Sequence, residues 1–345
     1  MNRFCVLTRV LALILSGSLR AGEAKPSALS EGTDPLTPDW RLEGTAAWPA
    51  RDSQAEWVFQ EKLWIGGGWF QSYEAPPRDV WASGDGKDWR LMVERAPWKH
   101  SDLPMNLVFE DRMWIMGGWF NGRLPGHSAG RQVWSSADGV EWREVTDSAA
   151  WSARLAAAAV VHRGKMWLLG GTMNYYFGDA TDLKNDVWSS ADGRNWKEET
   201  ASAAWTPRAY HQAVTLHGRI LLFGGGNYLP VAEARNDVWS SADGIGWTCE
   251  TQSAPWPPRL WFSAAVYRGR VWVLGGWSKE TDNLDDVWHS ADGREWQRLQ
   301  TPTRWKARHE HSVFVFQDKL WVAGGHARPL SGEVWSLSLP PDWKP

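Results

Sequence analysis

Cysteine is scarce in this chain, and neither sign of charge dominates it. Only two of its 345 residues are cysteine, Cys5 and Cys249, and the formal net charge is −3. Binding to DNA or RNA ordinarily requires a concentrated basic surface, which this balance of charge does not supply. We therefore expect no nucleic-acid partner, and a fold held together by packing and strand pairing instead of disulfides.

A hydrophobic run long enough to cross a bilayer is also missing. Near the N-terminus, the apolar residues 10–15 follow two arginines and precede several small residues. This order is typical of a cleaved secretory signal and is too short for a membrane span. We predict a signal peptide over residues 1–24, a flexible spacer over 25–37, and export to the periplasm or the extracellular space. The mature chain would keep only Cys249, so no internal disulfide is expected.

Glycine pairs and tryptophan, in contrast, are abundant and regularly ordered. A Gly-Gly pair closes an apolar run six times, and a Val-Trp dipeptide follows each pair, with a second tryptophan eight residues later. A period of about fifty residues is typical of a radially repeated antiparallel sheet. Five of the six intervals between paired tryptophans contain Asp-Gly, which predicts a tight hairpin. The glycine pairs begin at Gly67, Gly117, Gly170, Gly224, Gly275 and Gly324.

The order within each unit is an apolar strand, a turn, a second apolar strand ending in Gly-Gly, a variable loop and two spaced aromatics. This order resembles the kelch repeat. The resemblance implies an all-β fold, a six-bladed kelch-type β-propeller over residues 38–345 with four antiparallel strands in each blade. Kelch propellers include scaffolds, peptide-binding proteins, sugar mutarotases and copper oxidases, so the resemblance implies a fold without implying an activity.

The two chain ends are expected to meet in the last blade. The segment PDWRL at residues 38–42 repeats the fourth-strand pattern KDWRL at residues 87–91, although it precedes the first glycine pair. The sixth unit lacks the Asp-Gly hairpin and continues into Pro340 and Pro341, which disfavour a further strand. We therefore predict that the N-terminal strand completes the last blade and leaves Trp343 in a terminal tail.

Five of the six units share an arginine and an acid, and the remaining unit lacks both. That unit has Ser101 and Gln132 at the two positions. We predict a salt bridge within each blade, because a bidentate pair suits two strands that leave the same face. The alternative is a ring of arginines that binds an anionic sugar or a peptide carboxylate. The predicted pairs are Arg51 with Asp79, Arg154 with Asp186, Arg208 with Asp237, Arg259 with Asp286, and Arg308 with Glu333.

The loops after the glycine pairs differ between units and carry aromatic residues. In a four-stranded antiparallel blade, these loops emerge on the same face as the connections between blades, where a rigid ring commonly binds its ligand. We predict that this face binds a carbohydrate or protein ligand, with packing of each loop on itself as the alternative for individual aromatics. The predicted ligand-binding residues are Trp69, Phe70, Tyr73, Trp119, Phe120, Arg123, His127, Tyr175, Tyr176, Tyr228, Trp277, His326 and Arg328.

Candidate catalytic groups are few. His309 and His311 alternate on a predicted strand and are expected to share one face, but a metal site needs at least three convergent ligands. Trp57 and Trp261 lie in predicted innermost strands and could fill the central channel. The resemblance to copper oxidases is poor, because Cys249 is expected on an outer strand. We assign no metal and no cofactor.

The sequence therefore favours a monomeric, non-catalytic binding module that recognises a carbohydrate or a protein. The alternative is a carbohydrate-active enzyme that uses the same face, such as a sugar mutarotase, because interconversion of anomers requires only a placed acid and base. The candidate groups for that chemistry are Glu74, His127, Glu233 and His326.

Overall fold

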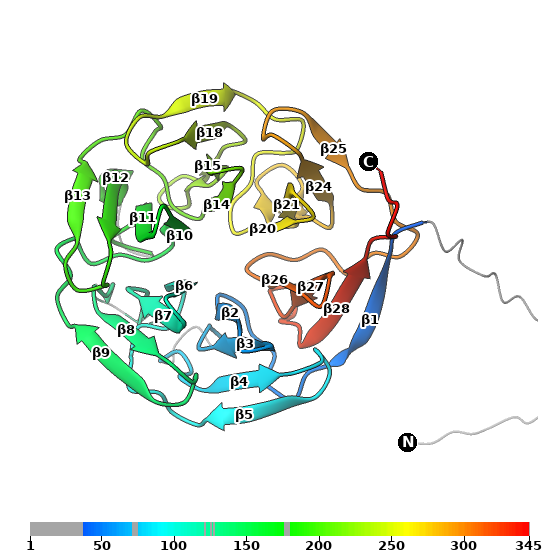
Figure 1. Cartoon of the computed structure of the whole chain (residues 1–345), viewed down its shortest axis with the longest axis horizontal. Coiled ribbons are helices and arrows are strands. Elements are labelled where there is room, and N and C mark those ends of the chain that lie inside the picture. The colour runs from blue at the N-terminus through cyan, green and yellow to red at the C-terminus, as the bar shows by residue number, and fades with distance from the viewer. Residues whose placement is uncertain are drawn as a thin grey trace, which may run out of the picture. The chain divides into compact units, whose positions relative to one another are not determined.

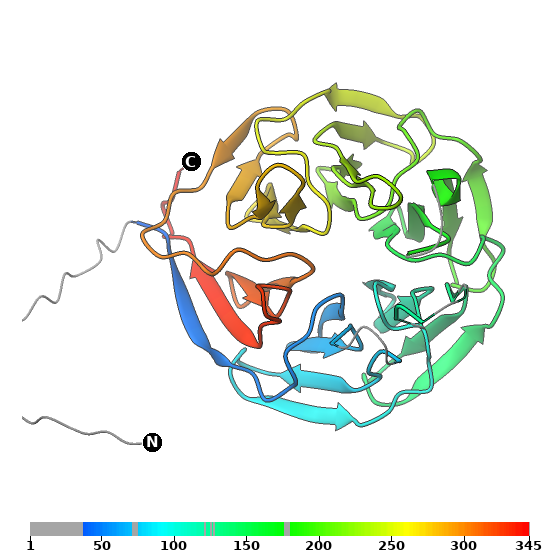
Figure 2. The same cartoon turned by 180° about the vertical axis from the view of Figure 1, so that it is seen from behind.

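The computed structural model describes residues 37–70, 75–120, 122–124, 126, 128–175 and 180–344. Within these residues, six four-stranded antiparallel sheets stand around one axis as the blades of a propeller (Figures 1 and 2). The all-β, six-bladed fold is thereby confirmed. The predicted signal peptide and nearly all of the predicted spacer lie outside the described residues. No helix in the described part of the chain is long and apolar enough to cross a membrane.

Each blade runs outward from an innermost strand, and we number the blades in the chain order of these strands. Each innermost strand contacts the innermost strands of both neighbouring blades, and β2 contacts β26, so the ring is closed. Blades 1 to 3 contain β2 (Ala55–Phe59), β3 (Lys62–Gly66), β4 (Val80–Ser83) and β5 (Trp89–Val93); β6 (Met105–Phe109), β7 (Arg112–Met116), β8 (Val133–Ser136) and β9 (Trp142–Thr146); and β10 (Ala158–His162), β11 (Lys165–Thr172), β12 (Leu183–Ser190) and β13 (Lys197–Thr200).

Blades 4 and 5 repeat this order, and short elements occur in the loops of blades 3, 4 and 5. A 3-10 turn, η1 (Ala180–Asp182), precedes β12, and small hairpins extend the loops of blades 4 and 5. Blades 4 and 5 contain β14 (Gln212–Leu216), β15 (Arg219–Phe223), β18 (Val238–Ser241) and β19 (Thr248–Thr251); and β20 (Ser263–Tyr267), β21 (Arg270–Leu274), β24 (Val287–Ser290) and β25 (Trp296–Arg298). The small hairpins are β16 (Gly226–Asn227) with β17 (Glu233–Ala234), and β22 (Trp277–Ser278) with β23 (Asp282–Asn283).

Blade 6 joins the two ends of the ring, as the sequence predicts. Its strands are β26 (Ser312–Phe316), β27 (Lys319–Ala323), β28 (Glu333–Ser338) and, outermost, β1 (Asp39–Thr45). Strand β1 pairs antiparallel with β28 over its whole length, with one irregularity between Leu42 and Gly44. Trp40 of β1 packs edge-on against Trp305, with 6.1 Å between ring centroids. Trp343 follows the last strand and packs on Trp272, with 5.8 Å between the ring centroids.

At three of the repeated positions the tryptophan makes a recurring hydrogen bond that satisfies its indole N–H. In blade 1, Trp64 of the second strand donates to the carbonyl of Phe59 at 2.9 Å. Trp89 of the fourth strand donates to the carbonyl of Gly86 at 3.1 Å. Trp81 of the third strand donates to the acid that immediately precedes the Val-Trp dipeptide, Asp79, at 2.6 Å. Five of the tryptophans that precede the arginine position have an indole N–H with no hydrogen-bond partner among the described residues, namely Trp48, Trp98, Trp151, Trp205 and Trp256.

The glycines of the Asp-Gly turns pack against the preceding blade. Gly244 has a φ of 79°, and a Cβ atom there would lie 2.2 Å from Cζ3 of Trp167 in the preceding blade. Gly164 has a similar φ of 68° but has open space at the corresponding position. A side chain at either glycine would strain the backbone, but only a side chain at Gly244 would also block a contact between blades. Comparing substitutions at the two positions therefore isolates the effect of the blocked contact.

We expect Gly244→Ala to lower the free energy of unfolding by about 1–3 kcal/mol more than Gly164→Ala, because only the former forces two blades apart. Urea denaturation of the two variants and the unchanged chain measures this difference. Equal midpoints for the two variants would show that packing against Trp167 contributes nothing at this turn.

Candidate functional site at the mouth of the propeller

The arginines that recur along the chain are structural and do not line the mouth. Arg259 is fully buried and donates to both carboxylate oxygens of Asp286, at 2.7 and 2.8 Å, and to the carbonyl of Gly275 at 2.8 Å. The pairs of Arg51, Arg154 and Arg208 form in the same way across their blades. Arg308 instead donates to one carboxylate oxygen of Glu333, at 2.6 Å, and to the hydroxyl of Ser331 at 3.2 Å. In blade 2, Ser101 donates instead to the carbonyl of Pro77 at 2.7 Å. The salt-bridge prediction is confirmed, and the arginine ring is not formed.

A belt of backbone hydrogen bonds joins the blades two residues after each arginine position. The amide of Ser53 donates to the carbonyl of Glu310, Leu103 donates to Ser53, and Ala156 donates to Leu103, each at 3.0–3.1 Å. The chain turns at positive φ at each of these positions, between 51° and 58°. The residues of this belt are Ser53, Leu103, Ala156, Tyr210, Trp261 and Glu310.

The belt lies between two hollows in the ring. One is the central channel, lined by the innermost strands, and the other opens on the loop face and is called the mouth below. Ser53, Trp261 and Glu310 line both. The residues that line the mouth are Asp52, Ser53, Trp69, Asp102, Arg123, Tyr175, Tyr228, Trp261, Trp277, His309, Glu310, His326 and Arg328.

Three carboxyl groups lie at the floor of the mouth, from blades 1, 2 and 6. Burial raises the pKa of Asp102 to about 7 and, together with the charge of Asp102, raises the pKa of Glu310 to about 8. Burial and the charges of Glu310 and Asp102 hold the pKa of Asp52 well above its ordinary value. Neither carboxylate oxygen of Asp102 has a hydrogen-bond partner among the described residues. The floor is therefore acidic, crowded and incompletely paired.

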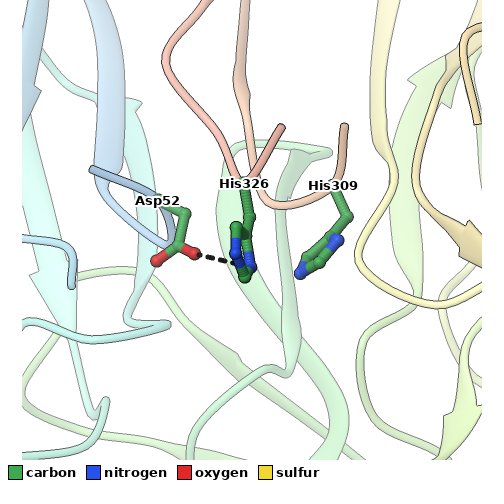
Figure 3. A group of neighbouring side chains, drawn as sticks. All are labelled: Asp52, His309 and His326. Atoms are coloured by element: carbon green, nitrogen blue, oxygen red, sulfur yellow. Dashed lines mark ion pairs between the residues drawn. The ribbon is translucent and has the colours of Figure 1, made fainter. Parts of the chain in front are cut away.

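Two histidines stand beside this acidic floor. Figure 3 shows His326 between Asp52 and His309, and the distance from His326 Nδ1 to Asp52 Oδ2 is 3.9 Å. His309 Nδ1 lies 2.6 Å from the side-chain oxygen of Asn283 in the small hairpin of blade 5. His309 Nε2 lies 3.6 Å from Glu310 Oε2. Burial lowers the pKa of His309 to about 3, so its ring is neutral at physiological pH.

Aromatic rings form the wall of the mouth on the side of blades 3 to 5. Trp261 stacks on His309 with ring centroids 5.4 Å apart, and it packs edge-on against Tyr228 at 4.7 Å and Trp277 at 5.8 Å. The hydroxyl of Tyr175 donates to Glu310 at 3.4 Å. The mouth thus combines flat apolar walls with a polar floor, an arrangement that suits a ligand with an apolar body and a polar tip.

Seven of the predicted ligand-binding residues come together around the mouth. They are Trp69, Arg123, Tyr175, Tyr228, Trp277, His326 and Arg328. Three others lie elsewhere. Trp119 is fully buried and donates to the carbonyl of Gly122, while Phe70 and Phe120 line a separate hollow between blades 1 and 2. Tyr73, His127 and Tyr176 lie outside the described residues.

The expectation that His309 and His311 share a face is wrong. Glu310, between them, has a φ of 52°, which breaks the alternation of an extended strand. His309 therefore faces the mouth, while His311 packs against Trp305 with 5.5 Å between ring centroids.

The sequence prediction also misplaces Trp57. Its ring lies in the core between blades 1 and 2, where its indole donates to the carbonyl of Trp114, and does not plug the channel.

The acids of the floor were missed because their positions show no recurring residue type. Asp52, Asp102 and His309 occupy the same repeat position, directly after the arginine or its replacement, and the other three units have Leu155, Ala209 and Leu260 there. The sequence did contain one sign of these acids, which is a polar residue at a position that is apolar in the other three units. Of the four candidate acid–base groups, His326 lines the mouth, Glu233 lies in β17 beside a separate hollow, and Glu74 and His127 lie outside the described residues.

We expect the stability of the folded chain to depend on pH through Asp102. The pKa of Asp102 is about 7 in the folded chain and about 3.9 in the unfolded chain, so folding takes up a proton at pH values between the two. The stabilisation that this proton uptake supplies is lost as pH rises from about 4 to 7. The stability of Asp102→Asn relative to the unchanged chain should therefore rise over this range by at most about 1.4 kcal/mol per pH unit, and level off above it. Urea denaturation at several pH values measures the difference, with exposed Asp147→Asn as the control. A difference independent of pH would contradict the assignment.

Comparison with known proteins supports the repeat architecture. The family described as the KLHDC2/KLHL20/DRC7 Kelch-repeats domain matches residues 179–342, just under half of the chain. An alignment of 100 positions that covers 27% of this chain is 38% identical to the dynein alpha chain of the flagellar outer arm of Chlamydomonas reinhardtii. The aligned stretch spans only 2% of that dynein chain.

Proposed function

Because this chain is a kelch-repeat β-propeller, we propose that it is a non-catalytic protein-binding module whose ligand enters the mouth. The observation that carries the proposal is the aromatic wall of Trp261, Tyr228 and Trp277 above a polar floor. Large, rigid aromatic rings around a concave site supply most of the binding energy at protein interfaces. The recurring arginines play no part in it, since each is satisfied within its own blade.

A peptide library displayed on phage tests this proposal. Peptides selected on the unchanged chain should bind Trp277→Ala at least about tenfold more weakly, because the truncated ring removes a wall of the mouth. Leu91→Ala is the matched control, since Leu91 is an exposed apolar residue on the outermost strand of blade 1. Peptides that bind Trp277→Ala and the unchanged chain equally, or that lose affinity for Leu91→Ala, would place the binding surface outside the mouth.

A carbohydrate-active enzyme is the second candidate, and one observation favours it. Glu310, with a pKa of about 8, lies beside His309 in the mouth, so a carboxyl group that can act as a general acid stands there near neutral pH. NMR of freshly dissolved glucose and galactose anomers tests this candidate. If the chain accelerates their equilibration and the acceleration falls by a factor of about 10²–10⁴ in Glu310→Gln, the enzyme candidate is supported. Equilibration rates equal to the blank would remove this candidate for those sugars.

We also propose that the chain is exported. The support is the order of arginines, apolar residues and small residues near the N-terminus. N-terminal sequencing of the chain recovered from outside the cytoplasm should begin after Ala21 or Ala24. A chain that is retained in the cytoplasm with residues 1–24 intact would contradict this proposal.

A further inference from the structure

We infer that the mouth is a binding site for a divalent first-row transition-metal ion, ligated by Asp52, His309 and His326. One side-chain atom from each of the three residues lies within 4.8 Å of the other two (Figure 3). Two imidazoles and one carboxylate favour Zn²⁺ or a similar transition metal over Ca²⁺ or Mg²⁺, which prefer oxygen ligands throughout. The inference does not depend on the proposed function, because occupancy by the metal can be measured without any partner.

Asn283 orients His309 as the outer partner of a metal-binding histidine would. Its side-chain amide donates to the backbone carbonyl of His326 at 2.7 Å, so its side-chain oxygen faces His309 Nδ1. Nδ1 must then carry the proton, and the lone pair of His309 lies on Nε2, on the side of the ring that faces Glu310. Such a hydrogen bond to the second ring nitrogen fixes the tautomer and the ring direction of ligating histidines. Asn283 thereby connects both histidine-bearing segments.

The distances are close to those of a bound site. Two ligand atoms bonded to one tetrahedral Zn²⁺ ion at about 2.1 Å lie about 3.4 Å apart. Asp52 Oδ2 and His326 Nδ1, at 3.9 Å, need to approach by only about 0.5 Å. Separations of up to 4.8 Å within the group need to close by about 1.4 Å, and the side chain of His326, with 34% of its surface exposed, has room to move. Glu310, 3.6 Å from His309, is positioned to supply a fourth ligand.

The charges around the site favour a cation. Asp52, Asp102 and Glu310 are all almost inaccessible to solvent, and neither oxygen of Asp102 is hydrogen-bonded within the described residues. The basic groups that line the mouth are Arg123 and Arg328, and Arg328 is paired with Asp282 at 2.6 Å. A divalent ion between Asp52 and the histidines would place positive charge beside these three buried acids.

The full chain, purified without a histidine tag and stripped with a chelator, should bind Zn²⁺ at a stoichiometry of one in calorimetry. Replacement by Co²⁺ should produce the visible absorption of a site with histidine and carboxylate ligands. His326→Ala and His309→Ala should each weaken Zn²⁺ binding at least about 100-fold, and Asn283→Ala about 10–100-fold through the orientation of His309. His217→Ala, an exposed histidine on a turn of blade 4, is the control and should bind as the unchanged chain does.

Circular dichroism of each variant shows whether it is folded, and the measurement on the unchanged chain does not depend on any variant. Absence of stoichiometric Zn²⁺ and Co²⁺ binding by the stripped, folded chain would overturn the inference. So would binding that survives in folded His326→Ala, or that is lost equally in His217→Ala. Loss of peptide binding in Trp277→Ala with unchanged Zn²⁺ binding would leave the metal site in place and bear only on the proposed function.

Discussion

Arg259→Ala should lower the free energy of unfolding by about 3–5 kcal/mol, because it leaves the buried carboxylate of Asp286 without its positive partner. Asp286 is only 7% exposed, and its two hydrogen bonds to Arg259 are buried. Burial alone would raise the pKa of Asp286, but the hydrogen bonds and charge of Arg259 outweigh that effect and lower it. The same substitution also removes the donor to Gly275 at the turn into the loop face.

The double variant Arg259→Ala/Asp286→Ala should be less destabilised than Arg259→Ala, since it removes the uncompensated charge as well. Arg328→Ala is the matched control. Its partner Asp282 is 46% exposed in the side chain, so its loss should cost no more than about 1 kcal/mol. Urea denaturation of the four proteins measures these differences. If Arg259→Ala and Arg328→Ala lowered the free energy of unfolding by the same small amount, the recurring pairs would not be needed for stability and the prediction would be wrong.

Removal of the strand that closes the ring should have the other large effect. A chain that begins at Ala46 lacks β1, so β28 becomes an exposed edge and Trp305 loses its contact with Trp40. Asp39 also accepts hydrogen bonds from the amide and hydroxyl of Thr303, at 2.7 and 3.0 Å. We expect this chain to unfold at markedly lower temperature or to aggregate. Trp40→Ala alone should cost about 3–5 kcal/mol as a large cavity in the core.

A chain that begins at Thr37 keeps β1 and is the control for this deletion. Thermal melting followed by circular dichroism, with light scattering for aggregation, compares the two truncated chains and Trp40→Ala. Trp343→Ala provides a second comparison, because Trp343 packs on Trp272 and His289 of blade 5 without a strand of its own. Truncation at Ala46 that leaves the melting temperature unchanged would show that the ring is stable when open.

Features that recur along the chain were predictable from the sequence, and features that occur once were not. The glycine pairs, the Asp-Gly turns and the arginine–acid pairs each appear in at least five units, so comparison between units identified their positions and partners. Ser101 and Gln132, where arginine and acid are both replaced, were especially informative. The floor of the mouth, in contrast, is formed by residues that differ from unit to unit, such as Asp102 and Glu310.

The turn that directs these residues inward was also hidden from the sequence. The belt of positive φ contains a serine, a leucine, an alanine, two aromatics and a glutamate, and only glycine would have indicated that backbone conformation. Because Glu310 lies on the belt, its backbone turns and His309 reaches the mouth while His311 enters the core. Strand alternation alone predicted the opposite.

The sequence by itself determined the number of blades, the strand that joins the chain ends and the salt bridge inside each blade, because each of these is a local pattern repeated at a constant period. Only the tertiary structure decided where the polar residues of single units meet. Asp52 of the first unit and His326 of the last lie 3.9 Å apart because the ring closes on itself, and no pattern along the chain encodes that distance. Closure turns the two most distant units into neighbours, and the three proposed metal ligands lie where they meet.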